Sequence, residues 1–232
     1  IVDFRAGAVD QGSFPLKKWR KCSNDVSHDP QIITYGERQG ESYLRKQIAS
    51  YLLQSRGIIT SSDAIVIGSS TQQLLMHVSL LLRKQFSSII LENPGYGGAR
   101  SVFTLNGYDI EAIDIGQKGI EMEQLEQMQS KLIYVTPSHQ YPTGTTIPIH
   151  ERQQLLQWAM SHGGYIFEDD YDSEFRYKQQ PIPALASLRQ DCVIYVSTFS
   201  KAFLPSLRLS YMVLPHKLLK VYQLMFSSFE QN

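Results

Sequence analysis

The stretch YVSTFSKAFLPSLRLSY, residues 195–211, sets one lysine, Lys201, behind three hydroxyl residues and ahead of Arg208. It continues from the apolar run CVIYVS (192–197), which has the length and β-branched content of a buried strand. Arginine binds phosphate through two parallel hydrogen bonds, and serine and threonine add donors, so this crowding suits a phosphorylated ligand. The stretch therefore predicts a sheet whose strand ends carry the functional residues.

Short apolar runs alternate with segments of helical period along the whole chain. Between the first two runs, for example, the apolar residues from Leu74 to Leu82 fall on one face of a helix. Strands separated by helices need crossover connections, so we predict an α/β fold, with a mostly parallel seven-stranded sheet and helices on both faces. The predicted strands span residues 64–68, 88–92, 108–113, 131–136, 165–169, 192–197 and 209–214.

Composition limits the classes of protein to which the chain can belong. Lys plus Arg equal Asp plus Glu, at 22 each in 232 residues, so no basic surface for nucleic acid or membrane is expected in this part. Two cysteines, Cys22 and Cys192, lack metal-ligand spacing, which favours the cytoplasm over a disulfide scaffold and predicts no metal site. No apolar stretch approaches the roughly 20 residues of a membrane span. Because the first residue is Ile1 rather than Met, we expect a piece of a longer protein.

Ligands of parallel sheets bind beyond the carboxyl ends of the strands, so the residues after each predicted strand matter most. GSSTQQLL (68–75) opens a helix, where free amides favour an anion such as phosphate. A glycine-rich loop, ENPGYGGAR (92–100), lets backbone approach a ligand and carries Tyr96. The turn PSHQYPTG (137–144) and the acidic segment EDDYDSEFRY (168–177) follow later strands. Each has a simpler explanation by itself: a helix cap, a packed aromatic, a proline turn or a solvated loop.

Taken together, these strand ends fit one chemistry. Pyridoxal 5′-phosphate needs a lysine amine for a Schiff base, a carboxylate that keeps its pyridine nitrogen protonated, and an anion cradle for its phosphate. The strand ends supply all three groups, together with an aromatic side chain for the ring. We therefore predict a pyridoxal-phosphate site, because an α/β domain without a cofactor would require five motifs to converge by coincidence.

These motifs also carry a resemblance to a known family. HQYPTG (139–144) resembles the Asn-Pro-Thr-Gly turn of aminotransferases, and EDDYDSEFRY and SKAFLPSLRLSY (200–211) resemble cofactor segments. YGERQGESYLRKQIASYL (35–52) and FPLKKWRK (14–21) are similar to a tyrosine-glycine-Leu-Arg block and a leading segment. The chain thus resembles the large domain of fold-type I pyridoxal-phosphate-dependent transferases, and most closely the aminotransferase-like domain of MocR-type regulators of the GntR family. The resemblance implies a leading segment and N-terminal helix in residues 1–60 and the cofactor-binding large domain in residues 61–232.

The resemblance implies a role for individual residues. Lys201 matches the Schiff-base lysine, Asp169 the partner of the pyridine nitrogen, and Tyr171 the hydroxyl beside the phenolic oxygen, and these three form the implied catalytic set. Tyr96 matches the residue stacked on the ring. Tyr35 matches a tyrosine that reaches the phosphate of the neighbouring subunit, which implies a homodimer. The other implied cofactor contacts are His139 and Tyr141 in the turn and a phosphate cradle of Ser70, Thr71, Thr198, Ser200 and Arg208.

The chain departs from the family pattern at a few positions. Tyr141 stands where ordinary aminotransferases have asparagine, a change typical of the regulator branch. Ser70, Ser206 and Ser210 stand where many relatives have glycine. The resemblance implies that these departures leave cofactor binding in place and bear on its tightness.

Two functions follow from the resemblance. In the first, the chain is the effector and dimerisation domain of a transcriptional regulator: pyridoxal phosphate, or its aldimine with an amino compound at Lys201, changes the DNA affinity of a winged-helix domain upstream of Ile1. In the second, the chain is part of a class I or II aminotransferase that acts on an amino acid, with Lys201 moving the proton. The family's arginine for the substrate carboxylate lies in a small C-terminal domain outside this chain, and HQYPTG and EDDYDSEFRY favour the regulator.

Overall fold

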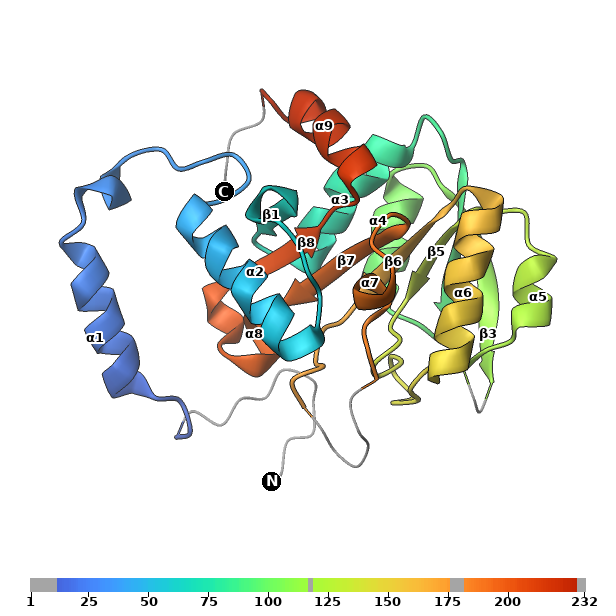
Figure 1. Cartoon of the computed structure of the whole chain (residues 1–232), viewed down its shortest axis with the longest axis horizontal. Helices are drawn as coiled ribbons and strands as arrows, with labels where there is room; N and C mark the ends of the chain where they lie inside the picture. The colour runs from blue at the N-terminus through green and yellow to red at the C-terminus, as the bar shows by residue number, and fades with distance from the viewer. Residues whose placement is uncertain (1–11, 117–118, 176–181, 229–232) are drawn as a thin grey trace. The chain divides into compact units, whose positions relative to one another are not determined.

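A mixed sheet with strand order β1-β8-β7-β6-β5-β2-β3-β4 forms the centre of residues 38–232 (Figure 1). The computed structural model describes residues 12–116, 119–175 and 182–228. Within these ranges the strands are β1 (Ile65–Gly68), β2 (Ser88–Asn93), β3 (Asp109–Gly116), β4 (Gly119–Ile120), β5 (Leu132–Val135), β6 (Tyr165–Asp169), β7 (Val193–Thr198) and β8 (Ser210–Val213).

Helices precede, separate and follow these strands. The described residues up to Glu37 belong to a unit of their own, with α1 (Leu16–Ser27) and the 3-10 helix η1 (Pro30–Ile33). None of the described helices is long and apolar enough to cross a membrane. The helices of residues 38–232 are α2 (Ser42–Arg56), η2 (Ser62–Ala64), α3 (Thr71–Leu82), α4 (Gly97–Leu105), α5 (Met122–Glu126), α6 (Ile149–His162), α7 (Leu185–Leu188), α8 (Phe199–Ala202), η3 (Pro205–Leu207) and α9 (His216–Met225).

Most of the sheet is parallel, which confirms the prediction. Strands β3, β2, β5, β6 and β7 pair in parallel in that order. Strand β8 pairs antiparallel with both β7 and β1, so β1 points the same way as the parallel strands. All seven predicted strands are present. Strand β4, which was not predicted, pairs with β3 and has two residues, too few to produce an apolar run.

Alternate residues of the strands enter two separate cores, one on each face of the sheet. On one face, Ile133 and Ile166 pack with apolar residues of α2, α5, α6 and α7. On the other face, Tyr134 and Phe167 pack with α3, α4 and α9. Strands β5 and β8 are buried at every residue because helices cover both of their faces. The prediction of helices on both faces is confirmed.

Helix α2 has a glycine with positive φ near each end, and the one before it lies against the sheet. Gly57, the predicted stop, has φ +69°, and its N–H bonds to the carbonyls of the last turn of α2. Gly40 has φ +91°, and a Cβ atom there would lie 2.3 Å from Cγ1 of Ile67 in β1. The Ile67 N–H donates to the carbonyl of Gln39 at 2.8 Å. The segment before α2 therefore lies directly against β1, where only glycine fits.

Candidate functional site

The register of β1, β8 and β7 brings the lysine stretch and the start of α3 to the same edge of the sheet. Thr198, at the end of β7, pairs with Ser210, and Ser210 is aligned in turn with Gly68, at the end of β1. Strand β6 is parallel to β7 and ends at Asp169, so its end lies at the same edge. This carboxyl edge gathers the predicted residues Ser70, Thr71, Tyr96, His139, Tyr141, Asp169, Tyr171, Thr198, Ser200, Lys201 and Arg208.

Asp169 is the buried acid of this edge. Asp169 is 5% exposed, and its Oδ2 accepts a hydrogen bond from the Tyr134 hydroxyl. Its Oδ1 is buried and has no hydrogen-bond partner among the described residues. Burial raises the pKa of Asp169 to about 7, although the Tyr134 hydrogen bond acts to lower it. A buried carboxylate oxygen of this kind is stabilised by a cation or an N–H group, such as a protonated ring nitrogen.

Hydroxyl side chains cap the two helices that follow β1 and β7 at the carboxyl edge. Ser70 caps α3, its Oγ accepting from the Gln73 N–H at 3.2 Å, and Thr71 is the first residue of that helix. Thr198 caps α8, its Oγ1 accepting from the Ser200 N–H at 3.1 Å and lying 2.9 Å from the Ser200 Oγ. These capping hydroxyls hold two helix starts at the edge where free N–H groups favour an anion.

The two cations of the lysine stretch influence acidic groups at the carboxyl edge. Lys201 is exposed in the last turn of α8, and its charge lowers the pKa of Asp172, which burial raises. Arg208 is exposed with φ 52°, the left-handed conformation, and its charge lowers the pKa of Tyr96, which burial raises. These charge effects agree with the register, which puts Lys201, after the end of β7, and Arg208, before the start of β8, at the edge where β6 ends.

Three tyrosines lie side by side along the edge. The rings of Tyr96 and Tyr141 have centroids 6.1 Å apart at 84°, and those of Tyr141 and Tyr171 lie 6.4 Å apart at 81°. Burial, followed by the charge of Asp169, raises the pKa of Tyr96. The edge-to-face contacts join the loops after β2, β5 and β6 into one aromatic wall.

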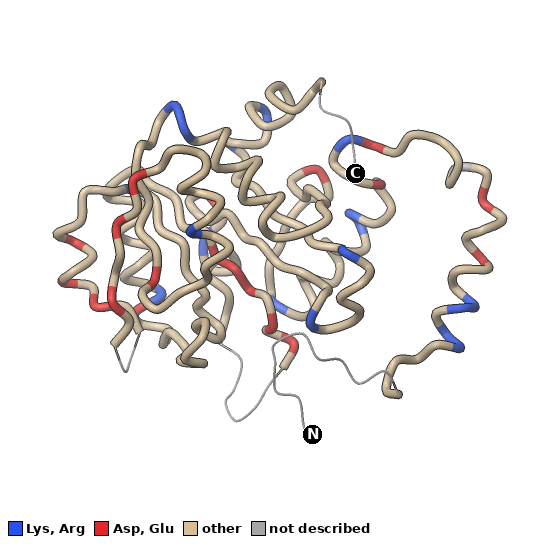
Figure 2. Tube along the Cα trace, turned by 180° about the vertical axis from the view of Figure 1, so that it is seen from behind, with Lys and Arg blue, Asp and Glu red and all other residues tan. Residues whose placement is uncertain are grey.

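His139 contacts the acidic segment that follows β6. Its Nδ1 lies 2.8 Å from Oδ1 of Asp172, and both side chains are mostly buried. Figure 2 shows the acidic residues of this segment gathered where the chain leaves the sheet. The segment was predicted to be either part of the site or a solvated loop, and Glu168, Asp169 and Asp170 are buried. The solvated-loop reading is therefore wrong for its first three acids.

Sequence reasoning missed a buried network that ties two of the loops together. Thr136 donates to both oxygens of Glu92, through its N–H at 3.2 Å and its hydroxyl at 2.7 Å. The Gln140 amide donates to Glu92 at 3.3 Å and to the Pro94 carbonyl at 2.8 Å. Burial raises the pKa of Glu92 to about 7 against these hydrogen bonds. Tyr134 was also missed, and its signal was a tyrosine inside an otherwise apolar buried strand, which needs a hydroxyl partner.

Tyr35 is the one predicted residue that belongs to the unit of residues 1–37. Its side chain is fully exposed, and it belongs to a different unit from the carboxyl edge. The implied contact of Tyr35 with a neighbouring subunit stays a prediction.

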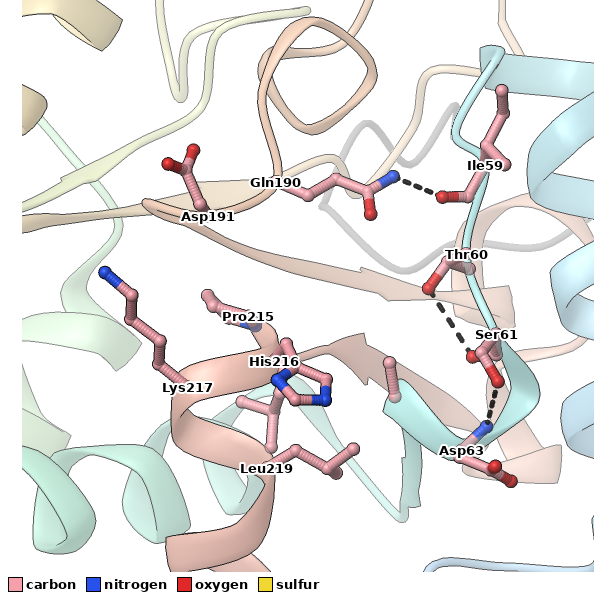
Figure 3. Close-up of a pocket in the computed structure, with 12 residues that line it drawn as sticks. Ile59, Thr60, Ser61, Asp63, Gln190, Asp191, Pro215, His216, Lys217 and Leu219 are labelled. Atoms are coloured by element: carbon pink, nitrogen blue, oxygen red, sulfur yellow. Dashed lines mark hydrogen bonds between the residues drawn. The ribbon is translucent and has the colours of Figure 1, made fainter.

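A separate hollow of about 850 Å³ opens at the opposite edge of the sheet, among the start of β1, the start of β7 and the end of β8 (Figure 3). One end of it is closed by the Gln190 side chain, whose Nε2 donates to the Ile59 carbonyl at 2.5 Å. Lys217 and Asp191 lie at its rim. None of the predicted site residues lines it.

Comparison with known proteins identifies the class to which this fold and site belong. The sequence model of the family Aminotransferase class I and II matches residues 1–229. The chain belongs to this family. Membership confirms the predicted fold class and supports the predicted cofactor.

Three relatives illustrate the range of proteins that the chain resembles. It is 43% identical over 222 residues to the uncharacterized HTH-type transcriptional regulator YdeL of Bacillus subtilis (strain 168), covering 94% of this chain and 48% of that protein. It is 31% identical to the probable rhizopine catabolism regulatory protein MocR of Rhizobium meliloti, covering 94% and 45%. The crystal structure of LysN, the α-aminoadipate aminotransferase of Thermus thermophilus, matches with a TM-score of 0.86 at 26% identity, covering 98% and 60%. The chain spans about half the length of the curated regulators it matches.

The residues present at the carboxyl edge fit pyridoxal 5′-phosphate. The uncompensated Oδ1 of Asp169 suits a protonated pyridine nitrogen, and the aromatic wall suits a flat ring. The helix starts at Ser70 and Thr198, with Arg208 nearby, suit a phosphate group.

Proposed function

We propose that this chain is the pyridoxal-phosphate-binding effector and dimerisation domain of a MocR-type transcriptional regulator of the GntR family. The observation that carries the cofactor site is the buried, unpartnered Oδ1 of Asp169 at the same sheet edge as Lys201. The similarity to regulators, at 43% and 31% identity over nearly the whole chain, supports the regulatory role. In this proposal residues 1–60 are the leading segment with the N-terminal helix, and residues 61–232 are the large domain.

Each residue of the edge has a defined task in this proposal. Bound pyridoxal 5′-phosphate supplies a carbonyl group for Schiff-base formation and a ring that accepts electrons. Lys201 would provide the amine, and Asp169 would keep the ring nitrogen protonated through Oδ1. Tyr171 would bind the phenolic oxygen, and Tyr96 would pack against the ring. The remaining contacts are His139 and Tyr141 beside the ring and Ser70, Thr71, Thr198, Ser200 and Arg208 around the phosphate.

The regulatory step lies outside the described residues. In this proposal DNA is bound by a helix-turn-helix domain of the whole protein, because the relative YdeL, of which this chain spans 48%, is named an HTH-type transcriptional regulator. The ligand that shifts the regulator is pyridoxal phosphate itself or an amino compound that reacts at Lys201. A homodimer, in which Tyr35 of each subunit reaches the other subunit's phosphate, links the site to the assembly. The compartment that fits this role is the cytoplasm.

Chemical labelling tests the cofactor site. The protein is mixed with pyridoxal 5′-phosphate, reduced with borohydride, digested, and the labelled peptide is mapped by mass spectrometry. We expect the label on Lys201. Lys201→Ala should lose the label and stay folded, because an exposed side chain in a short helix contributes within about 0.5 kcal/mol to stability. A folded wild-type protein without label, or a label that persists in Lys201→Ala, contradicts the proposal.

DNA binding tests the regulatory role separately. The full-length protein is titrated with DNA from upstream of its own gene, with and without pyridoxal phosphate and a panel of amino acids. We expect the affinity for DNA to change with ligand in the wild type and to be insensitive in Lys201→Ala. Equal DNA affinity under all these conditions would leave the cofactor site without a regulatory role.

The second candidate is an aminotransferase that acts on an amino acid. It is favoured by the match of 98% of this chain to LysN, an aminotransferase whose crystal structure is complexed with N-(5′-phosphopyridoxyl)-L-leucine. Only an aminotransferase converts many molecules of amino acid per molecule of protein. Formation of 2-oxo acid in amounts well above that of the protein would establish the enzyme, and its absence together with ligand-dependent DNA binding would establish the regulator.

A further inference from the structure

The guanidinium group of Arg56, at the end of α2, joins two of the loops at the carboxyl edge. Its Nε donates to Oδ2 of Asp170 at 2.7 Å, and its Nη2 donates to Oγ of Ser138 at 3.0 Å. The side chains of Arg56 and Asp170 are 7% and 0% exposed, so this ion pair is buried. One rigid, planar group thus contacts the loop after β5 and the loop after β6 at the same time.

Asp170 is held from several sides in addition to Arg56. The Tyr195 hydroxyl donates to its Oδ2 at 2.7 Å, and the Ser197 hydroxyl donates to its carbonyl at 2.9 Å. Its own N–H donates to the Val196 carbonyl at 2.9 Å. Asp170 therefore fixes the chain between its two neighbours, Asp169 and Tyr171.

Ser138 gives Arg56 a second connection to the site. The carbonyl of Ser138 accepts from the Thr146 hydroxyl at 2.9 Å, and the next residue is His139. His139 contacts Asp172, which follows Tyr171, at 2.8 Å. The loops after β5 and β6 are consequently bridged twice, once through Arg56 on Asp170 and once through His139 on Asp172.

We propose that Arg56 is a positioning residue for the cofactor: through Asp170 and Ser138 it fixes where the Asp169 carboxylate and the Tyr171 hydroxyl lie. The inference rests on the proposed cofactor site, and neither Arg56 nor Asp170 is assigned a contact with the cofactor. Lysine cannot replace arginine here, because a single ammonium group lacks the fork that reaches a carboxylate and a hydroxyl in two directions.

The test compares two arginine-to-lysine changes on the same helix. Arg56→Lys keeps the charge for Asp170 and loses the bridge to Ser138. Arg45→Lys is the matched control, because Arg45 is also buried on α2 and donates to the Gly40 carbonyl at 2.8 Å and the Ser62 carbonyl at 2.7 Å. Both changes are expected to lower stability, so stability alone decides nothing.

Two readouts in the full chain separate positioning from mere support of the fold: the Kd for pyridoxal phosphate, and the pH dependence of the visible absorption of the bound cofactor. For Arg56→Lys we expect a Kd at least about tenfold higher and a shifted pH profile, since loss of one charge-assisted contact corresponds to about 1.4 kcal/mol. Arg45→Lys should keep both wild-type values. A folded Arg56→Lys protein with the wild-type Kd and pH profile would overturn the proposal.

A second variant covers the case in which Arg56→Lys does not fold. In Arg56→Met/Asp170→Asn neither partner leaves a charge unpaired, so the fold is retained more easily. The double variant should still bind pyridoxal phosphate more weakly and with an altered pH profile, because the bridge to Ser138 is gone. Wild-type behaviour in the double variant would refute the positioning role. A wild-type protein that binds no pyridoxal phosphate would instead refute the proposed cofactor site.

Discussion

The Tyr134 hydroxyl donates a hydrogen bond to the Asp169 carboxylate across the neighbouring strands β5 and β6. Tyr134 is fully buried, and burial, followed by the charge of Asp169, raises its pKa well above the usual value of tyrosine. The tyrosine therefore stays protonated, and the direction of the hydrogen bond is fixed. One oxygen of Asp169 is always occupied by the protein, and the other is left for a ligand.

Tyr134→Phe removes this donor with almost no change in shape. The hydrogen bond lowers the pKa of Asp169, so its loss should raise that pKa further and leave less carboxylate to pair with a ring nitrogen. We expect the Kd for pyridoxal phosphate at pH 7 to rise about tenfold, measured by fluorescence titration, while Lys201 is still labelled after reduction. An unchanged Kd would show that Asp169 needs no help from Tyr134.

Asp169 should also make the stability of the cofactor-free protein depend on pH. Its pKa is about 7 in the folded chain and about 3.9 when unfolded, so between these values the folded state binds the extra proton. The resulting stabilisation is complete below about pH 4 and is lost as the pH rises through about 7. We expect chemical denaturation of the protein without cofactor to give a falling free energy of unfolding from pH 5 to pH 8.

Asp169→Asn is the variant that isolates this contribution. Asparagine keeps an oxygen for the Tyr134 hydroxyl and has no proton to release, so the decline from pH 5 to pH 8 should become shallower. Glu92 and Glu168, whose pKa values burial also raises to about 7, maintain the rest of the decline. An identical pH dependence in wild type and variant would mean that Asp169 is not titrating in this range.

The sequence predicted the strands and the edge where the site forms because both depend on local pattern. Runs such as CVIYVS have strand length and content, and small polar residues at their ends recur often enough to mark one edge. Strand β4 and the reversal of β8 were not predicted. The first has two residues, and the second depends on how the segment between Thr198 and Ser210 turns, which hydrophobic periodicity does not encode.

Partners that are distant in sequence were beyond local pattern as well. Arg56 and Asp170 are separated by 114 positions, and Glu92 and Gln140 by 48, so neither pair leaves a spacing signal. Asp170 looked like one more acid in an acidic segment. Asp170 differs from Asp172 in burial. It is the first residue after β6, its N–H still bonds to the Val196 carbonyl of β7, and its side chain lies in the core, which local pattern does not reveal.

Gly40 and Gly57 provide a test of how α2 is fixed to the sheet. Both have positive φ, so alanine is strained at either position, by about 1 kcal/mol. At Gly40 the new Cβ would also lie 2.3 Å from the Ile67 side chain, whereas at Gly57 nothing lies within 4 Å. We expect Gly40→Ala to lose about 2–4 kcal/mol and Gly57→Ala about 1 kcal/mol in urea denaturation. Equal losses would show that α2 is free to move away from β1.

Variants of two helix-capping residues at opposite edges of the sheet can distinguish ligand binding from helix capping. Thr198 accepts from the Ser200 N–H at 3.1 Å at the carboxyl edge, and Ser61 accepts from the Asp63 N–H at 3.2 Å at the other edge. Thr198→Val and Ser61→Ala each remove a cap, so each should cost about 1 kcal/mol or less in stability. If the carboxyl edge binds a phosphate group, only Thr198→Val should raise the Kd for pyridoxal phosphate, and inorganic phosphate should compete for the wild-type site. Similar Kd values for the two variants would mean that Thr198 caps its helix without contacting the ligand, and the phosphate would then have to be held by Ser70, Thr71 and Arg208.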